Sequence, residues 1–374
     1  MNKEDIKTFF LIFFILLLIF GISVFGIKIY LNIMGGSENI KDIFHIGNVI
    51  ISPEENTANK NESSTGNQND ILNQISSSGS QSSTSSKVGY YYNQLSDYSK
   101  LIYDKLKNNK ENIKTGTYKI DFGTSFSKLL SNENGSDLLQ KYYQTAMETF
   151  LYDNPDIFYL DATKMYINIK TTQKLFHTTY EVYIDSGNYS NYLAEGFNSR
   201  NQILNYESQI EQEVQKILAK VEGKSDYYKM QIIHDYLIDN VSYEETVSKP
   251  NIYNIYGTLV NKESVCEGYA KTFKYLMDKV GIKSIVVIGE ATDSKGETQN
   301  HAWNYVYFNN AWYAIDVTWD DPVIINGGTL SNKNRYKYFL KGTNTMIKDH
   351  EESFTFIENG TVYEHPALST NDYK

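Results

Sequence analysis

The chain has 374 residues and a mass of 43.0 kDa, with 35 basic and 45 acidic side chains that give a formal net charge of −10. A pI near 5.2 argues against a nucleic-acid binder, because such proteins draw their affinity from basic side chains on phosphates. One cysteine excludes an intramolecular disulfide. The 41% of hydrophobic residues is enough for a core, and the length predicts two or three structural parts.

The first predicted element is a membrane anchor within residues 1–34. Residues 9–27 are almost wholly apolar, and no charge falls between Lys7 and Lys28. About 20 apolar residues span a bilayer as a helix. No small-residue cleavage site follows this segment, so an uncleaved transmembrane helix is favoured over a signal peptide. The positive charges before the helix predict a cytoplasmic N-terminus, with the bulk of the chain at the cell surface.

A flexible tether is predicted next, over residues 35–87. Its part from 52 to 87 has no aromatic residue and is rich in Ser, Asn, Gly, Gln and Thr. Such a composition buries too little apolar area to offset the chain entropy of folding. Two folded parts are expected after it, a small α+β module over 88–222 and a second domain over 223–374.

The module shows alternating helical and strand-like patterns but no nucleophile or metal-ligand spacing. Its apolar residues recur at helical intervals in two segments and alternate in three others. The predicted helices are 91–107 and 137–151, the predicted strands are 118–122, 165–169 and 178–184, and a connecting helix is predicted over 201–221.

The second domain contains the lone cysteine at the start of a predicted helix. A helix is predicted over 224–240, and after a loop Ser264 and Glu267 have the S-x-x-E spacing of a capping box. This spacing predicts Ser264 as the N-cap and Cys266 as the second helical residue. The backbone N–H groups and the dipole of a helix N-terminus favour thiolate and can stabilise an oxyanion. The alternative is that Cys266 is a small core residue.

A hairpin downstream is predicted to supply a base and its partner. A short apolar strand over 285–288 precedes strands over 301–308 and 311–319, joined at Asn309-Asn310 by a two-residue type I′ turn. That register places His301 opposite Thr318 and puts Asp316 on the same face as a diagonal neighbour, within side-chain reach. A carboxylate against an imidazole is the arrangement that a general base and its orienting partner require.

Three sequence runs together resemble the core of the transglutaminase-like superfamily, in particular its bacterial membrane-anchored surface branch. The runs are Ser264 to Ala270 (SVCEGYA), His301 to Asn304 (HAWN) and Asp316 to Pro322 (DVTWDDP), within a resemblance over about 224–338. The run DNPDIFY at 153–159 is similar to a segment that often precedes this core. The resemblance implies an α+β, papain-like fold, in which a helix bearing the cysteine packs on an antiparallel sheet. It also implies Cys266 as nucleophile, His301 as base and acid, and Asp316 as the residue that orients His301.

The reaction implied by this resemblance is attack of a thiolate on a protein or peptide amide, which gives a thioester. Water would then complete a protease or amidase reaction, and a lysine amine would complete a crosslink. Relatives include transglutaminases, cysteine proteases, peptide N-glycanases and inactive modules. The alternatives are a surface interaction or scaffold module without turnover, and a soluble cytosolic protease. The expected partners are the substrate, the membrane and, as an option, cell-wall components.

The second oxyanion donor is left open among Tyr243, Tyr256 and Asn261, with core packing the favoured interpretation for each. Trp303 and Trp319 flank the triad strands and either exclude water or fill the core. No metal or cofactor is expected, because no further ligand spacing and no Gly-rich phosphate loop occurs.

Two further pairs of adjacent polar residues, His234-Asp235 and Asp320-Asp321, are interpreted as structural. His234 and Asp235 are adjacent on a helix and should not share a face. Asp320 and Asp321 precede Pro322, as in a turn.

Overall fold

The computed structural model describes residues 50–53, 89–321, 335–353, 357–358, 361–362 and 364–374. The predicted anchor at 9–27 and nearly all of the predicted tether lie outside these residues. Among the described residues, no helix combines the length and apolar character that a bilayer crossing requires.

The first folded part is a small α+β module in which helices cover one four-stranded sheet. The strand order is β1-β3-β4-β2, with β1 parallel to β3 and the other neighbours antiparallel. The elements are β1 (Ile50–Pro53), η2 (Tyr92–Gln94), α4 (Asp97–Asn108), α5 (Lys110–Ile113), β2 (Ile120–Gly123), α6 (Ser127–Leu130), α7 (Gly135–Asp153), η3 (Ala162–Lys164), β3 (Tyr166–Gln173) and β4 (Thr178–Asp185). The three strands and the second helix predicted for this region are confirmed.

The first predicted helix, over 91–107, is interrupted. A 3-10 turn, η2, is separated from α4 by Leu95 and Ser96, both of which are extended. Ser96 ends the interruption because its side chain accepts a hydrogen bond from the N–H of Ser99 at 3.3 Å, as an N-cap residue does. The helix therefore starts at Asp97.

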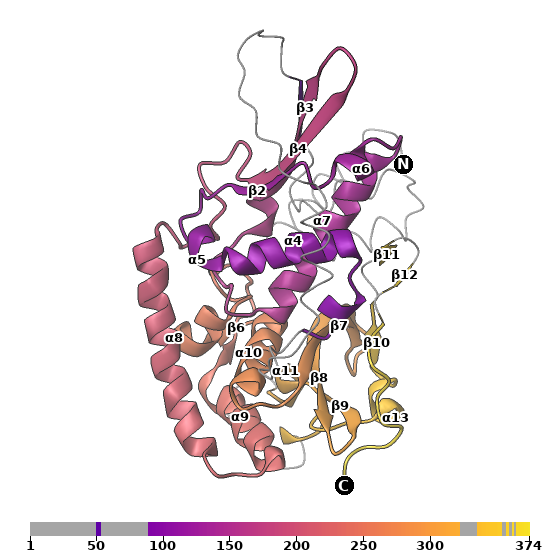
Figure 1. Cartoon of the computed structure of the whole chain (residues 1–374). Helices are drawn as coiled ribbons and strands as arrows, with labels where there is room; N and C mark the ends of the chain where they lie inside the picture. Colours follow the sequence, from indigo (N-terminus) through magenta and orange to yellow (C-terminus); the bar gives the residue numbers. More distant parts are fainter. Residues whose placement is uncertain (1–49, 54–88, 322–334, 354–356, 359–360, 363) are drawn as a thin grey trace, which may run out of the picture.

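A long helix, α8 (Arg200–Val221), runs along one side of the molecule and connects the module to the second part (Figure 1). Its N-cap is Ser199, whose side chain accepts from the N–H of Gln202 at 3.3 Å. The buried residues Ile203, Ile210, Val214 and Ile217 form the stripe that faces the core. The predicted helix over 201–221 is confirmed.

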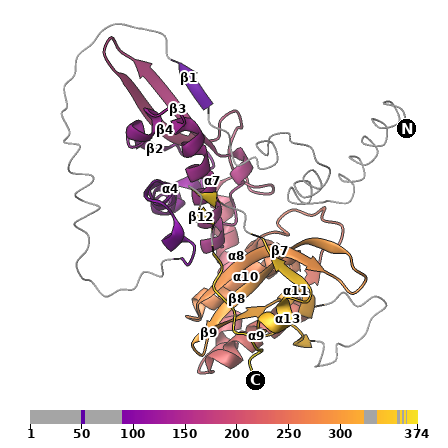
Figure 2. The same cartoon turned by 90° about the vertical axis from the view of Figure 1, so that its right-hand side faces the viewer.

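The second part packs α10 against an antiparallel sheet of strand order β10-β7-β8-β9. In both views this sheet lies at the end of the molecule opposite the module sheet, with α4 and α7 between them (Figure 1 and Figure 2). Its elements are α9 (Asp226–Asn240), β5 (Ser242–Tyr243), η4 (Gly257–Asn261), β6 (Glu263–Ser264), α10 (Cys266–Lys279), β7 (Ser284–Thr292), β8 (Thr298–Phe308), β9 (Ala311–Ile315), α11 (Val317–Asp320), α13 (Thr343–Met346), β10 (His350–Glu352), β11 (Ile357–Glu358) and β12 (Thr361–Val362).

The hairpin turn between β8 and β9 has the predicted form. Asn309 and Asn310 both have positive φ, at 49° and 63°, which is the type I′ requirement. Phe308 pairs with Ala311, and the same register continues to the pair of Asn304 with Ile315.

Beyond Ile315 the strand prediction is wrong. The chain leaves the sheet there and turns into the short helix α11, so Thr318 is helical and does not lie opposite His301. His301 instead has a strand neighbour on its other side, Gly289 of β7.

The module and the second part share one continuous apolar core. The Tyr91 hydroxyl donates to the Val286 carbonyl oxygen at 2.7 Å, and the side chain of Asn254 donates to the Phe158 carbonyl oxygen at 3.3 Å. Both bonds join the two parts directly. The last turn of α7 consequently lies against the start of α10, which is where the candidate site is found.

Candidate active site

Cys266 is the first residue of α10, and the predicted capping box is wrong. The N-cap is Val265, which makes no side-chain cap. Ser264 lies one residue earlier, in β6, where its hydroxyl donates to the Ile252 carbonyl oxygen at 3.1 Å instead of bonding the helix. Cys266 nevertheless lies in the first turn of the helix, as predicted. The N–H groups of a first turn lack intrahelical partners and favour an anion beside them.

Close packing fixes this end of α10. A Cβ atom on Gly268 would lie 2.2 Å from the Ser264 hydroxyl and 2.4 Å from the Ile252 carbonyl oxygen. The helix start can therefore approach the preceding loop only because residue 268 has no side chain. The thiol of Cys266 is partly exposed, beside buried Ala270, Val286 and Ala302.

His301 lies between the cysteine and an aspartate. It extends from β8, is 3% exposed, and its Nε2 lies 2.7 Å from Oδ2 of Asp316. The side chain of Cys266 lies close enough to the same imidazole to influence its pKa. The structure thus brings the three predicted site residues together, although Asp316 arrives by a different route from the predicted strand pairing.

Asp316 is held by the fold at both of its oxygens. It is the N-cap residue of α11, and its Oδ1 accepts from the N–H of Trp319 at 3.1 Å. Its Oδ2 accepts from His301 and faces a second histidine, His350. Burial alone would raise the pKa of this carboxyl group, but the two histidines hold it well below its usual range.

The pKa of His301 is shifted in the opposite direction, upward. Burial would lower the pKa of an imidazole, but the Asp316 carboxylate and then the Cys266 thiol raise the pKa of His301 to about 10. The site therefore favours an imidazolium at neutral pH. An imidazolium beside the thiol stabilises its ionised form, which is the nucleophile.

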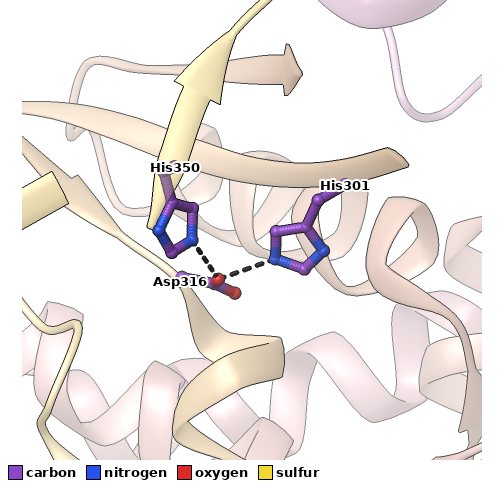
Figure 3. A group of neighbouring side chains, drawn as sticks. All are labelled: His301, Asp316 and His350. Carbon is purple, nitrogen blue, oxygen red and sulfur yellow. Dashed lines mark hydrogen bonds and ion pairs between the residues drawn. The ribbon is translucent and has the colours of Figure 1, made fainter. Parts of the chain in front are cut away.

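His350 is a part of this site that the sequence reasoning did not identify. It begins strand β10 at the edge of the sheet, and its Nε2 lies 3.0 Å from Oδ2 of Asp316 (Figure 3). Its Nδ1 lies 2.8 Å from Oδ1 of Asp349. No short-range signal marks it, because the contact depends on the pairing of β10 with β7, far away in the sequence.

His301, Asp316 and His350 are also the group of potential metal ligands found among the described residues. Figure 3 shows both rings directed at the same carboxylate oxygen. That oxygen is at hydrogen-bond distance from each ring, at 2.7 and 3.0 Å. The three side chains therefore bond to one another, and the geometry is that of a shared hydrogen-bond acceptor.

One of the three candidates for a second oxyanion donor lies beside the thiol. The Tyr243 phenol is close to both the Cys266 side chain and the Cys266 backbone N–H. Tyr256 instead stacks on Tyr206, with ring centroids 4.2 Å apart, in the apolar core. Asn261 is exposed at the end of η4.

His234 has a structural role, but the argument that it cannot meet Asp235 is wrong. Its Nδ1 lies 3.1 Å from Oδ1 of Asp235, and its Nε2 lies 3.1 Å from Oδ2 of Asp320. Asp320 is fully buried and ends α11 rather than lying in the predicted turn, and its other oxygen accepts from the N–H of Tyr338 at 2.8 Å. These bonds tie α9 to α11 and to the segment after it.

Tyrosines from several elements surround the thiol. Tyr152, in the last turn of α7, packs beside Cys266, and Tyr253 lies nearby. Tyr253 and Lys271 also line an open pocket of about 380 Å³ between the loop over 247–254 and the module. The module therefore supplies a neighbour of the cysteine, Tyr152, and part of the lining of this pocket, which neither Cys266 nor His301 lines.

Comparisons with known proteins agree with this geometry. Residues 215–317 match the family model described as the transglutaminase-like superfamily. The mouse (Mus musculus) kyphoscoliosis peptidase is 23% identical over 143 residues, which cover 34% of this chain and 21% of that protein. The chain thus matches about a fifth of the length of that relative.

Two solved structures are similar to part of this chain. A crystal structure described as a TGase is 16% identical, with 48% of this chain and 50% of that chain covered and a TM-score of 0.29. The periplasmic domain of TgpA from Pseudomonas aeruginosa, bound to ethylmercury, is 13% identical, with 39% and 58% covered and a TM-score of 0.25. The resemblance to a bacterial surface branch stays a prediction.

Proposed function

We propose that this chain, in which residues 215–317 form a domain of the transglutaminase-like superfamily, is a thiol enzyme that attacks amide carbonyls of proteins or peptides. The observation that carries the proposal is the position of His301, between the Cys266 thiol and the buried Asp316 carboxylate. A nucleophile, a base and an orienting acid in this order are the parts that acyl transfer needs.

The first half-reaction forms a thioester. The Cys266 thiolate adds to the carbonyl carbon, and the oxygen takes the negative charge. The carbon–nitrogen bond then breaks, and the His301 imidazolium gives its proton to the departing amine. Asp316 keeps the imidazole oriented throughout, because its Oδ2 accepts from Nε2 and leaves the other ring nitrogen for Cys266.

The second half-reaction regenerates the thiolate. Neutral His301 takes a proton from water or from an incoming amine, whose oxygen or nitrogen attacks the thioester and displaces Cys266. Hydrolysis and amine transfer differ only in this acceptor. Two product assays on the same peptide substrate distinguish them. Hydrolysis releases a free carboxylate, and amine transfer incorporates a fluorescent primary amine.

The oxyanion would be stabilised by the Cys266 backbone N–H and by the Tyr243 hydroxyl. The N–H lies at the positive end of α10, and the phenol stands beside it. A rotatable O–H at that position can donate to the same oxygen as the N–H. We therefore assign Tyr243 as the second donor and leave Tyr256 and Asn261 out of the site.

The pocket beside Tyr253 is proposed to hold a part of the substrate away from the scissile amide, because neither Cys266 nor His301 lines it. Its walls come from both the module and the second domain, so the module would contribute to substrate choice. Its lining carries both polar and apolar groups, including Lys249 and Phe158, as a peptide-binding surface requires.

The proposed location is the cell surface, with the chain held by a transmembrane helix at residues 9–27. The test is protease treatment of intact cells, followed by detection of the chain in the membrane fraction. Loss of the folded part from intact cells is expected. Full protection, or recovery of the chain in the soluble fraction, would contradict this location.

The activity is tested through the single cysteine of the full-length chain. The rate of iodoacetamide alkylation is followed by mass spectrometry from pH 4 to 9. At pH 6 the wild type is expected to react at least about tenfold faster than His301→Ala, because only the wild type has an imidazolium beside the thiol. His177→Ala, which removes an exposed histidine of the module, is the control and should match the wild type. Equal alkylation rates for the wild type and both variants would mean that Cys266 and His301 do not form a working pair. The chain would then be a scaffold module without turnover.

A further inference from the structure

The Asp316 carboxylate serves two imidazoles at one oxygen. Oδ2 lies 2.7 Å from Nε2 of His301 and 3.0 Å from Nε2 of His350, while Oδ1 bonds the backbone of Trp319. The proposed mechanism uses only the first of these bonds. His350 is therefore a buried polar group of the site that the mechanism does not use.

The second nitrogen of His350 faces another carboxylate. Its Nδ1 lies 2.8 Å from Oδ1 of Asp349, and Oδ2 of Asp349 accepts from the Tyr338 hydroxyl at 2.6 Å. Each nitrogen of His350 can bond the carboxylate that it faces only by donating a proton, so both bonds form together only in an imidazolium.

The surroundings of His350 suit a cation. Three aromatic rings enclose it, with centroid distances of 4.7 Å for Trp319, 5.1 Å for Trp303 and 5.1 Å for Tyr338. Aromatic rings stabilise a nearby positive charge and exclude water. The charged or titratable groups that face His350 are Asp316, Asp349, His301 and Tyr338, and the two carboxylates contact it directly.

We propose that His350 is a positioning residue that holds Asp316 and divides its negative charge between two imidazoliums. This inference rests on the proposed function, because it needs a working Cys266–His301 pair. Charges would then alternate along the row from the Cys266 thiolate through His301, Asp316 and His350 to Asp349. Asp349, whose side chain is 23% exposed, ends the row near solvent.

The consequence concerns how tightly His301 keeps its proton. A cation on the far side of Asp316 weakens the field that the carboxylate exerts on His301 and repels the second positive charge. The ring centroids of the two histidines are 5.6 Å apart, close enough for this repulsion to act. His350 therefore makes the His301 proton easier to release, as a general acid requires when the amine departs.

The test compares two alkylating reagents on the full-length chain. Iodoacetate is anionic and iodoacetamide is neutral, so the ratio of their rates with Cys266 is high while His301 holds its proton and falls when that proton leaves. The ratio is measured against pH, in EDTA, for the wild type, His350→Gln and His365→Gln. His365 is a matched control, because its Nδ1 also faces a carboxylate, at 2.8 Å, but that carboxylate belongs to Glu352.

In His350→Gln the midpoint of the fall is expected about one pH unit higher than in the wild type, with no change in His365→Gln. Asp349→Asn is the second variant, since it changes only the partly exposed end of the row and leaves His350 in place. It should shift the midpoint in the same direction, because a neutral partner no longer requires the second proton on the ring.

Other outcomes overturn the inference in distinguishable ways. An unchanged or lower midpoint in both variants, with a normal wild-type profile, removes His350 from the mechanism and leaves the proposed function standing. A wild-type ratio that stays low at every pH, as in His301→Ala, contradicts the proposed function itself. If micromolar Zn²⁺ in EDTA-free buffer blocks alkylation of the wild type but not of His350→Gln, the three side chains form a metal site, and the positioning role falls.

Discussion

At the residue scale, the site depends on one carboxylate, Asp316, whose two oxygens both have hydrogen-bond partners. Asp316 accepts from a helix N–H with one oxygen and from two imidazoles with the other, and it is fully buried. An ionised group can remain in such a place only because each of these donors offsets its lost hydration. The same bonds set the direction of the His301 ring. The Asp316 carboxylate therefore determines both the charge of His301 and the orientation of its ring.

Replacement of this carboxylate by an amide tests whether its charge keeps His301 protonated. In Asp316→Asn the side chain keeps its size but loses its charge, so the pKa of His301 should fall and the thiolate should no longer form at low pH. The alkylation rate at pH 6 is expected to drop at least about tenfold. Asp293→Asn, in the exposed turn between β7 and β8, makes the same change without touching the site and should leave the rate unaltered. A normal rate in Asp316→Asn would mean that another group holds the His301 proton.

The proposed role of Tyr243 separates oxyanion stabilisation from thiolate formation. Tyr243→Phe removes the second donor and should lower the burst rate of acyl-enzyme formation from p-nitrophenyl acetate by about 10- to 100-fold. Its alkylation rate should change little, because alkylation forms no oxyanion. Tyr228→Phe is the control, since that ring is 56% exposed on α9 and does not line the proposed substrate pocket. A loss of alkylation equal to the loss of acylation would indicate a displaced thiol instead.

The residues that sequence alone identifies are those whose role is local. Cys266 and His301 follow from a helix start and a strand pattern, and the Asn309-Asn310 turn follows from the backbone conformation that Asn tolerates. His350 could not be found in this way, because its contact with Asp316 joins positions 34 residues apart through a tertiary strand pairing.

At the scale of elements, the start of α10 is placed by packing rather than by a capping side chain. Its N-cap is an apolar valine, and the preceding serine bonds a loop carbonyl. Motif spacing predicts that a helix starts there but cannot show which backbone groups compete for the serine hydroxyl. The same limit explains α11, where Asp316 caps a new helix and ends the strand that alternation alone would continue.

Gly268→Ala tests how firmly that helix start is held. The new Cβ would overlap the Ile252 carbonyl oxygen, at 2.4 Å, and that backbone atom cannot move away alone. We expect a loss of about 1–3 kcal/mol in the free energy of unfolding and a slower alkylation of Cys266. Lys279→Ala, at the far end of the same helix, should cost only a few tenths of a kcal/mol by urea unfolding. Wild-type stability in Gly268→Ala would show that the loop can retreat.

At the scale of the whole molecule, a buried acid lies where the module meets the second domain. Asp153 ends α7, and its Oδ2 is buried with no hydrogen-bond partner within the described part of the chain. Burial raises the pKa of this carboxyl group to about 6, although Lys274 and the N–H of Tyr92 oppose the shift. Because this pKa lies above the unfolded value, the folded state binds the proton more tightly. The bound proton therefore stabilises the folded state. This contribution to the free energy of unfolding is complete below about pH 4 and is lost as the pH rises through 6.

Asp153→Asn should therefore change stability in a pH-dependent way. The variant is expected to equal the wild type near pH 4 and to be more stable by about 2 kcal/mol at pH 7, measured by urea unfolding at the two pH values. Asp156→Asn is the control, because that carboxylate is exposed and pairs with Lys110 at 3.4 Å. A gain that is the same at both pH values would mean that the effect does not come from ionisation.

Strand β10 has a consequence for the order in which the site is assembled. The segment that matches the family model ends at residue 317, but His350 reaches the site from a strand more than thirty residues later. A ribosome releases the N-terminal part first, so Cys266 and His301 emerge well before their last neighbour. On our proposal, Asp316 would face His301 alone until β10 pairs with β7, and His301 would hold its proton more tightly than in the finished fold. Transfer of that proton to a departing amine would therefore reach its full rate only after β10 has joined the sheet.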